Sequence, residues 1–464
     1  MDLRIDRQAQ VPVVQQIVDA LTGWLCSGAV PPGACLPSVR QIAQNNLLSQ
    51  SSVVQACERL VAQGLLVPGH GSGFRVAPPI PAASAKTAWP WLDSPDVCTD
   101  SHRLCLGGGG LPESWRETDD LAYAIRQVSH TDMSSLFNYS SPLGLPALRQ
   151  QILRRLNQLE IFPDADRVLT TAGASQGLDL IVRTLFKPGD CVVVESPGYP
   201  LLFELLRLHG IGMLQVPRTP CGPDVEVLEA VLLKHRPRGM FVNSFHHNPT
   251  GSSLTPLVAR RLLQLTADHD VRVIEDDVYA DFHCGPGVRL AALDDRVIYL
   301  GSFSKTLSSA LRVGFVAADA EVVTRLAEVK MISSMGVSAF SEAVLACLLA
   351  NGAYNKLVLR QRQRLNRERR AALQLLDDGE WQVFGKPAGG LFIWARSPMA
   401  DLGELQARAR QMAIQLASPT AFSASGEHHD WLRINVACAS DPRARSFFLG
   451  AAQTTSAVLK TTGT

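Results

Sequence analysis

A lysine that directly follows an apolar segment is the most promising chemical group in this chain. The run VIYLGSFS (297–304) is typical of a buried strand, and Lys305 comes immediately after it. In open α/β sheets, ligands bind at the carboxyl ends of the strands. A lysine amine at such a place can form a Schiff base with an aldehyde cofactor. We therefore expect Lys305 to be a covalent attachment site.

Three polar residues upstream would complement an aldehyde cofactor of the pyridoxal type. Asp276 ends a second apolar run, and Tyr279 lies three residues further on. A pyridoxal ring needs a carboxylate at its pyridinium nitrogen, because the protonated ring is the better electron sink. Asn248 opens the sequence NPTG after another strand-like run and offers a side-chain amide donor. These residue types fit the ring of such a cofactor.

A phosphate group would find partners in two further segments. GASQG (173–177) joins a strand-like run to a helical pattern, so its amide groups and the helix dipole suit an anion. Arg312, seven residues after Lys305, can add charge-assisted contacts to the same anion.

The elements that must position these residues begin near residue 103, where strand-like and helical patterns alternate. Such alternation predicts an α/β domain with a mainly parallel sheet covered by helices. A helical stretch from about 320 to 372 then leads into a smaller C-terminal α+β subdomain. The strand-like runs are 167–171, 191–195, 240–243, 271–277, 297–304 and 314–318.

The first 77 residues form a separate block. Helical apolar spacing recurs around 14–25, 38–43 and 49–61, and the glycine-rich turn PGHGSG separates two short strand-like runs. This order predicts an α+β winged helix-turn-helix. We expect a multidomain chain: a DNA-binding domain at 1–77, a proline-rich linker at 78–102, a cofactor-binding domain at 103–450 and a tail at 451–464.

Composition indicates the cellular compartment of the protein but excludes few classes of binding partner. The formal net charge is +1, the apolar fraction is 46%, and the ten cysteines include no C-x-x-C pair. Scattered cysteines favour reduced thiols in a cytoplasmic protein, with no metal site. The chain has no apolar run of membrane-spanning length, and its first residues lack a secretory pattern, so we expect no membrane association.

Residues 103–440 resemble the fold type I family of pyridoxal-phosphate enzymes, the aspartate-aminotransferase type. The family has a phosphate loop, a ring-stacking aromatic, N-P-x-G, D-x-x-Y, S-x-x-K and a substrate-binding arginine, in that order. The corresponding segments here are GASQG, SPGYP, NPTG, DDVY, SFSK and LRINVA.

The resemblance implies pyridoxal 5'-phosphate as cofactor and Lys305 as its Schiff-base residue. It implies that Tyr199 stacks on the ring, that Arg433 binds the carboxylate of an amino-acid ligand, and that Tyr139 reaches the phosphate of the partner subunit in a homodimer. The full set of implied cofactor-binding residues is Ser175, Gln176, Tyr199, Asn248, Asp276, Tyr279, Ser302, Lys305, Arg312 and Tyr139.

The N-terminal block resembles the GntR winged-helix family, through PGACLPSVRQIAQ, SSVVQACERLVAQGLL and GHGSGFRV. The two halves in this order resemble the MocR subfamily of GntR regulators. The resemblance implies binding to operator half-sites in double-stranded DNA. The implied DNA-binding residues are Ser38, Arg40, Ser49, Gln50, Ser51, Ser52, Gly71 and Arg75.

One departure concerns charge. The family often has arginine after the serine that starts the recognition helix, whereas this chain has Gln50. Residues 1–77 hold five arginines, no lysine and four acidic residues, a balance of about +1. We expect weak DNA binding by a single domain, so that the spacing of half-sites in a dimer contributes much of the specificity.

These patterns favour a ligand-responsive transcription regulator that senses an amino compound, or pyridoxal phosphate itself, at Lys305. The alternative is a working aminotransferase that acts on an amino acid; a bare DNA-binding module is a third class.

LGGGG (106–110) does not open a helix, so it predicts a turn near the ligand and no dinucleotide site. His246 and His247 are expected to be satisfied loop histidines, and the basic run 360–370 a solvated helix face.

Overall fold

The computed structural model describes residues 3, 5–6, 11–26, 31, 33–69, 73–77, 102–116, 118–130, 138–283, 287–427 and 430–450. The chain divides into two compact units, Met1–Pro90 and Trp91–Thr464. The predicted linker lies outside the described residues except for residue 102, and the predicted tail at 451–464 lies wholly outside them.

The first unit is a winged helix-turn-helix. Its helix α3 begins because the Ser49 side chain accepts a hydrogen bond from the Ser52 N–H, and apolar side chains at helical spacing then face the core. Strands β1 and β2 pair as an antiparallel hairpin against these helices. The elements are α1 (Val13–Cys26), α2 (Val39–Asn45), α3 (Gln50–Ala62), β1 (Leu66–Gly69) and β2 (Gly73–Val76).

The second unit is built on a large mixed sheet with the strand order β3-β10-β9-β8-β7-β4-β5-β6. The central strands β5, β4, β7, β8 and β9 are parallel, while β10 runs antiparallel to both of its neighbours. The bounds are β3 (Val168–Thr171), β4 (Cys191–Ser196), β5 (Gly212–Thr219), β6 (Gly222–Pro223), β7 (Gly239–Val242), β8 (Arg272–Asp276), β9 (Ile298–Ser302) and β10 (Gly314–Ala317).

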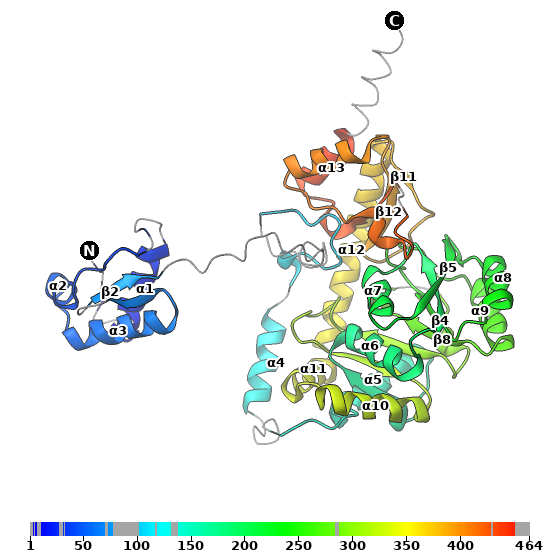
Figure 1. Cartoon of the computed structure of the whole chain (residues 1–464), viewed down its shortest axis with the longest axis horizontal. Coiled ribbons are helices and arrows are strands. Elements are labelled where there is room, and N and C mark those ends of the chain that lie inside the picture. The colour runs from blue at the N-terminus through cyan, green and yellow to red at the C-terminus, as the bar shows by residue number, and fades with distance from the viewer. Residues whose placement is uncertain are drawn as a thin grey trace, which may run out of the picture. The chain divides into compact units, whose positions relative to one another are not determined.

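Helices surround this sheet, as Figure 1 shows. Strands β7 and β10 are buried along their whole length, which explains why their sequences, GMFV and GFVA, are continuously apolar. The helices of this layer are α4 (Asp119–His130), α5 (Pro146–Gln158), α6 (Gly173–Leu185), α7 (Pro200–Leu208), α8 (Val225–His235), α9 (Pro256–Asp268), α10 (Ala320–Ser334) and α11 (Ala339–Ala350).

A small C-terminal subdomain follows the long helix α12 (Ala353–Asp378). Helix α12 contacts α11 on one side and strand β11 on the other, so it joins the two parts of the unit (Figure 1). The subdomain contains an antiparallel sheet in the order β11-β12-β13, with β11 (Gln382–Val383), β12 (Phe392–Arg396), helix α13 (Leu402–Gln411) and β13 (Trp431–Asn435).

The fold predicted from the sequence is confirmed: a winged helix-turn-helix, a mainly parallel α/β sheet and a smaller C-terminal α+β part. Strand β5 was missed, because its sequence GMLQVPRT alternates weakly and contains a proline. The expectation of reduced thiols fails at Cys105, which is disulfide-bonded. Among the described residues, no helix combines the length and apolarity that crossing a bilayer requires.

Candidate functional site

Lys305 and Asp276 lie at the same edge of the large sheet. Asp276 is the last residue of β8, and Lys305 follows the end of β9, the parallel neighbour of β8. Parallel strands end at one edge, which is where α/β sheets bind ligands. The Lys305 ammonium is half-buried, and its Nζ donates a hydrogen bond to the Gly109 carbonyl at 2.8 Å.

The Asp276 carboxyl is poorly stabilised as an anion. Burial raises its pKa to about 7, while the hydrogen bond from the Val278 N–H lowers it; Asp277 raises it further and Lys305 lowers it. Oδ1 of Asp276 accepts that Val278 bond at 3.2 Å. An additional hydrogen-bond donor beside such a carboxyl group would stabilise its anionic form and lower its pKa. A protonated ring nitrogen would be such a donor.

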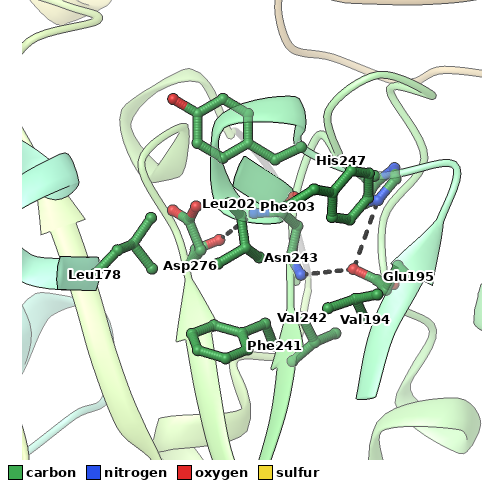
Figure 2. A pocket seen from close by; sticks show the side chains of 12 residues that line it. Leu178, Val194, Glu195, Leu202, Phe203, Phe241, Val242, Asn243, His247 and Asp276 are labelled. Carbon is green, nitrogen blue, oxygen red and sulfur yellow. Dashed lines mark hydrogen bonds and ion pairs between the residues drawn. The ribbon is translucent and has the colours of Figure 1, made fainter. Parts of the chain in front are cut away.

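A pocket lies beside Asp276, and Figure 2 shows the side chains that line it. Asn243 lies between Asp276 and Glu195: its Nδ2 donates to the Asp276 carbonyl at 2.7 Å, and its backbone N–H donates to Glu195 Oε2 at 2.9 Å. Tyr199, expected to stack on the cofactor ring, also lines this pocket. The pocket therefore brings together Asp276 and Tyr199, two of the residues expected on the ring.

Two of the residues that line this pocket, Glu195 and His247, belong to a buried polar cluster. Arg218 Nη1 donates to Glu195 Oε1 at 2.5 Å, and Arg218 Nε donates to Ser252 Oγ at 2.9 Å. His247 Nε2 lies 3.5 Å from Glu195 Oε2, and its Nδ1 lies 2.9 Å from Thr250 Oγ1. Burial, and then Arg218, hold the pKa of His247 well below its usual value, so the ring is neutral.

This cluster was missed in the sequence, although Glu195 directly precedes SPGYP and His247 directly precedes NPTG. A charged residue at the end of an apolar strand was the available signal. His247 is a satisfied loop histidine, as predicted. His246 is not, because both of its buried ring nitrogens lack a hydrogen-bond partner among the described residues. It packs against Gly389 and Gly390 of the small subdomain.

The expected phosphate site lies at the N-terminus of α6. Gly173 has φ +77°, and a Cβ there would lie 2.5 Å from Arg312 Nη2, so only glycine lets the guanidinium lie this close to the helix end. Arg312 is exposed and donates to the Ala172 carbonyl at 3.0 Å. Gln176 Oε1 accepts from the Ala172 N–H at 2.6 Å.

The remaining residues expected around the cofactor differ in exposure. Ser175 is exposed on the first turn of α6, and Ser302 is half-buried at the end of β9. Tyr279 is buried, with its ring edge-on to Phe392 at 5.6 Å. Tyr139 is 81% exposed. This exposure leaves the Tyr139 side chain accessible to a second subunit.

Arg433, on β13, is a fully buried cation. It is 1% exposed and lies between the rings of Phe392 and Phe422, whose centroids are 4.7 and 5.0 Å from its Cζ. Its Nη1 donates to Asn248 Oδ1 at 2.9 Å, and its Nε and Nη2 both donate to the Gly107 carbonyl, at 3.0 and 2.7 Å. The structure thus joins Arg433 and Asn248 directly.

These residues fit pyridoxal phosphate. They offer an amine at Lys305, an under-stabilised carboxyl at Asp276, an aromatic wall at Tyr199, and a glycine-opened helix terminus beside Arg312. Among the described residues, no group of three or more histidine, cysteine, aspartate or glutamate side chains could hold a metal ion.

The expected DNA-binding residues lie at two helix starts and on one strand. Ser38 forms a capping box with Gln41 at the start of α2, and the Ser49 hydroxyl, at the start of α3, lies 2.9 and 2.7 Å from those of Ser51 and Ser52. Arg40, Gln50 and, on β2, Arg75 are exposed, as are Ser38, Ser49 and Ser51, whereas Ser52 is half-buried. Gly71 lies outside the described residues.

Comparisons with known proteins agree with both halves. Residues 105–447 match the aminotransferase class I and II family, and residues 13–76 match the bacterial regulatory proteins of the gntR family. The chain is 30% identical over 454 residues to the uncharacterised HTH-type transcriptional regulator YjiR of Escherichia coli, covering 91% of this chain and 94% of that protein.

Two further relatives come from Thermus thermophilus. The chain is 34% identical over 343 residues to a 2-aminoadipate transaminase, covering 71% of this chain and 84% of the relative. The crystal structure of LysN, an α-aminoadipate aminotransferase, superposes with a TM-score of 0.70 and 28% identity over 77% of this chain and 94% of that one. With a GntR head joined to an aminotransferase domain, and with relatives that are HTH-type regulators, the chain belongs to the aminotransferase class I and II family and has the architecture of MocR regulators.

Proposed function

We propose that this protein is a cytoplasmic, homodimeric transcription regulator that binds pyridoxal phosphate at Lys305 and changes its DNA binding when an amino compound, or the cofactor itself, occupies the site. The observation that carries the proposal is the coexistence of an intact amine-and-carboxyl pair, Lys305 and Asp276, with a GntR head in one chain. We assign the head to 1–77, the linker to 78–102, the cofactor-binding domain to 103–450 and the tail to 451–464.

Each residue has a defined task in this proposal. When bound, pyridoxal phosphate supplies an aldehyde carbon that condenses with amines and a ring that withdraws electrons. Asp276 holds a proton at the ring nitrogen, and Tyr199 covers a ring face. Asn248 and Tyr279 orient the ring oxygen. The phosphate is held by Ser175, Gln176, Ser302, Arg312 and, from the second subunit, Tyr139. Arg433 binds the carboxylate of the effector.

DNA binding is assigned to the exposed starts of α2 and α3 and to the wing. Arg40 and Arg75 contact phosphates, and Gln50 contacts a base edge. The other proposed contacts are Ser38, Ser49, Ser51, Ser52 and Gly71. The effector must bind the two DNA-binding states with different affinity, because only then can it shift their populations.

The test titrates fluorescent DNA from upstream of the protein's own gene with full-length protein, first with pyridoxal phosphate alone and then with a panel of L-amino acids added. A response to the cofactor alone identifies the cofactor as the signal, whereas a response that needs an amino acid identifies a separate effector. The Lys305→Ala variant should respond to neither amino acid nor amine. Unaltered DNA binding in all of these conditions would reject the proposal.

A working aminotransferase is the second candidate, favoured by the 34% identity to a 2-aminoadipate transaminase. Incubation with L-2-aminoadipate and 2-oxoglutarate tests it directly. Formation of glutamate at a steady rate, lost in Lys305→Ala, would establish turnover.

A further inference from the structure

The glycine run Gly107–Gly110 holds the two cations of the site through its backbone. The Gly107 carbonyl accepts from both Nε and Nη2 of Arg433, at 3.0 and 2.7 Å. The Gly109 carbonyl accepts from Lys305 Nζ at 2.8 Å. The side chains that would meet a ligand's carboxylate and the cofactor's aldehyde therefore share one backbone segment.

A single side chain anchors the rest of this segment. Asn435 Nδ2 donates to the carbonyl of Gly108 at 2.9 Å and to that of Gly110 at 2.7 Å. The Asn435 backbone N–H donates to the Leu106 carbonyl at 2.7 Å. Asn435 is 1% exposed, so these hydrogen bonds are shielded from water. Its amide nitrogen thus fixes the orientation of the peptides that lie between and beyond the two cation contacts.

The edge of Arg433 that faces Gly107 is one of the two edges through which a guanidinium can bind a carboxylate. A guanidinium binds a carboxylate with two parallel N–H donors, and Nε with Nη2 forms one such pair. In this structure a neutral carbonyl oxygen takes both donors. A carboxylate is the stronger acceptor, because it carries the opposite charge and offers one oxygen to each of the two N–H donors.

The neighbouring backbone leaves no room for a side chain at Gly107 and holds its N–H group in place. A Cβ on Gly107 would lie 2.2 Å from the Ala417 backbone nitrogen, so no larger residue fits without movement of the chain. The Gly107 N–H donates to the Gln415 carbonyl at 3.0 Å. Upstream of this bond the segment continues the pairing between Leu104 and Ile414. Rotation of the peptide that follows Gly107 would release the carbonyl from Arg433 and break the hydrogen bond from the Gly108 N–H to the Cys105 carbonyl, at 3.0 Å, while the Gly107 N–H stays paired with Gln415.

We propose that the Gly107 carbonyl is a built-in competitor for the ligand's carboxylate at Arg433, and that Asn435 is the positioning residue that sets how strongly it competes. This inference rests on the proposed function. A ligand with a carboxylate displaces the carbonyl, whereas an amine without one leaves it in place. The glycine run thereby makes the site discriminate between amino acids and simple amines, and it does so just downstream of the segment that leads to the DNA-binding head.

The test compares amino acids with amines that lack only the α-carboxylate: L-alanine with ethylamine, and L-leucine with 3-methylbutylamine. Full-length, cofactor-loaded protein is titrated by absorbance, and hydrogen–deuterium exchange is followed in the peptide that covers 104–111. Amino acids should raise exchange in this peptide and the matched amines should not. Exchange that is unchanged at saturating L-amino acid would overturn the inference.

The Asn435→Ser variant tests the positioning role. Serine can still accept from the Ala437 N–H, as Asn435 Oδ1 does at 3.0 Å, but it cannot donate to both glycine carbonyls. The amino-acid concentration at half-saturation should fall about threefold or more, the effect of losing roughly one neutral hydrogen bond, with amine binding unchanged. Equal tightening for amines, or no change for amino acids, would contradict the assignment.

The Gly110→Ala variant provides an independent check if Asn435→Ser folds poorly. Nothing lies within 4 Å of a Cβ at Gly110, so alanine fits there and only stiffens the run. Amino acids should then bind more weakly, with amines unaffected; unaltered amino-acid binding would count against the inference. If neither amino acids nor amines bind any variant or the wild type, the amino-compound form of the proposed function fails, and the cofactor itself is left as the proposed signal. If amino acids bind without altering exchange, only the inference fails.

Discussion

Replacing Arg433 by glutamine tests the effector site most sharply. Glutamine keeps an amide donor for the Gly107 carbonyl and removes the positive charge. The native side chain is 1% exposed and makes its hydrogen bonds to Gly107 and Asn248. Because both of these acceptors are neutral, loss of the cation leaves neither of them as an uncompensated buried charge.

The expected loss follows from the chemistry of the pair. A hydrogen bond to a charged group contributes about 1.5–3 kcal/mol. Since about 1.4 kcal/mol corresponds to a factor of ten, Arg433→Gln should weaken amino-acid binding by roughly ten- to a hundredfold. Ethylamine, which has no carboxylate to lose, should bind the variant as it binds the wild type.

The assay measures half-saturating concentrations of L-alanine and ethylamine by cofactor absorbance, and the concentration of each that alters DNA binding by fluorescence anisotropy. Thermal unfolding of both proteins checks that the variant is folded. The reasoning is refuted if the ratio of the two half-saturating concentrations is the same in the variant and the wild type, because Arg433 would then not contact the carboxylate.

Further predictions concern the cofactor, pH and DNA. Borohydride reduction of cofactor-loaded protein should fix a pyridoxyl group on the peptide that contains Lys305, and mass spectrometry should find none there in Lys305→Ala; an adduct of equal yield elsewhere in that variant would reject the assignment. Burial raises the pKa of Asp276 to about 7 from 3.8, so folding of the cofactor-free protein favours the protonated acid, and the free energy of unfolding should fall as pH rises from about 4 to 7. Urea unfolding should show a shallower fall in Asp276→Asn, and identical slopes would contradict the burial argument. Arg40→Ala should weaken binding to all DNA sequences and reduce the salt slope by about 1, whereas Gln50→Ala should alter base preference at one position; a binding-site selection on both variants distinguishes these outcomes.

The sequence was sufficient to predict the parts of the site that depend on strand ends. Asp276 and Lys305 follow apolar runs that form β8 and β9, and the parallel pairing of those strands brings the two residues to one edge. The start of α6 was predictable for the same reason, because GASQG follows the strand-like run that forms β3.

The contacts that close the site could not be predicted in this way. LGGGG predicted only a turn near the ligand, since a glycine run carries no side-chain signal. That its carbonyls accept from Arg433 and Asn435 depends on how the small subdomain packs against the start of the unit. The pairing of Glu195 with Arg218 likewise joins the neighbouring parallel strands β4 and β5, and neither sequence segment specifies the other.

For the basic run 360–370, the sequence predicted the helix but not the partners of its charged side chains. Its position within α12 agrees with the predicted helix, yet part of this stretch is occupied with intramolecular contacts. Arg360 lies 3.6 Å from Asp120, and Arg369 donates to Asn366 at 2.8 Å. Local charge predicted a solvated face, and only the tertiary structure shows how many of these cations already have partners.

The separation along the chain of the groups that meet at the site has a consequence for biosynthesis. Lys305 and Gly109 are 196 residues apart, and Arg433 and Gly107 are 326 residues apart. Such long-range contacts form late in folding, and the chain is made from its N-terminus. The DNA-binding head, whose core is local in sequence, is complete long before Arg433 leaves the ribosome. A newly made chain therefore has a folded N-terminal head before Arg433 and Gly107 can meet.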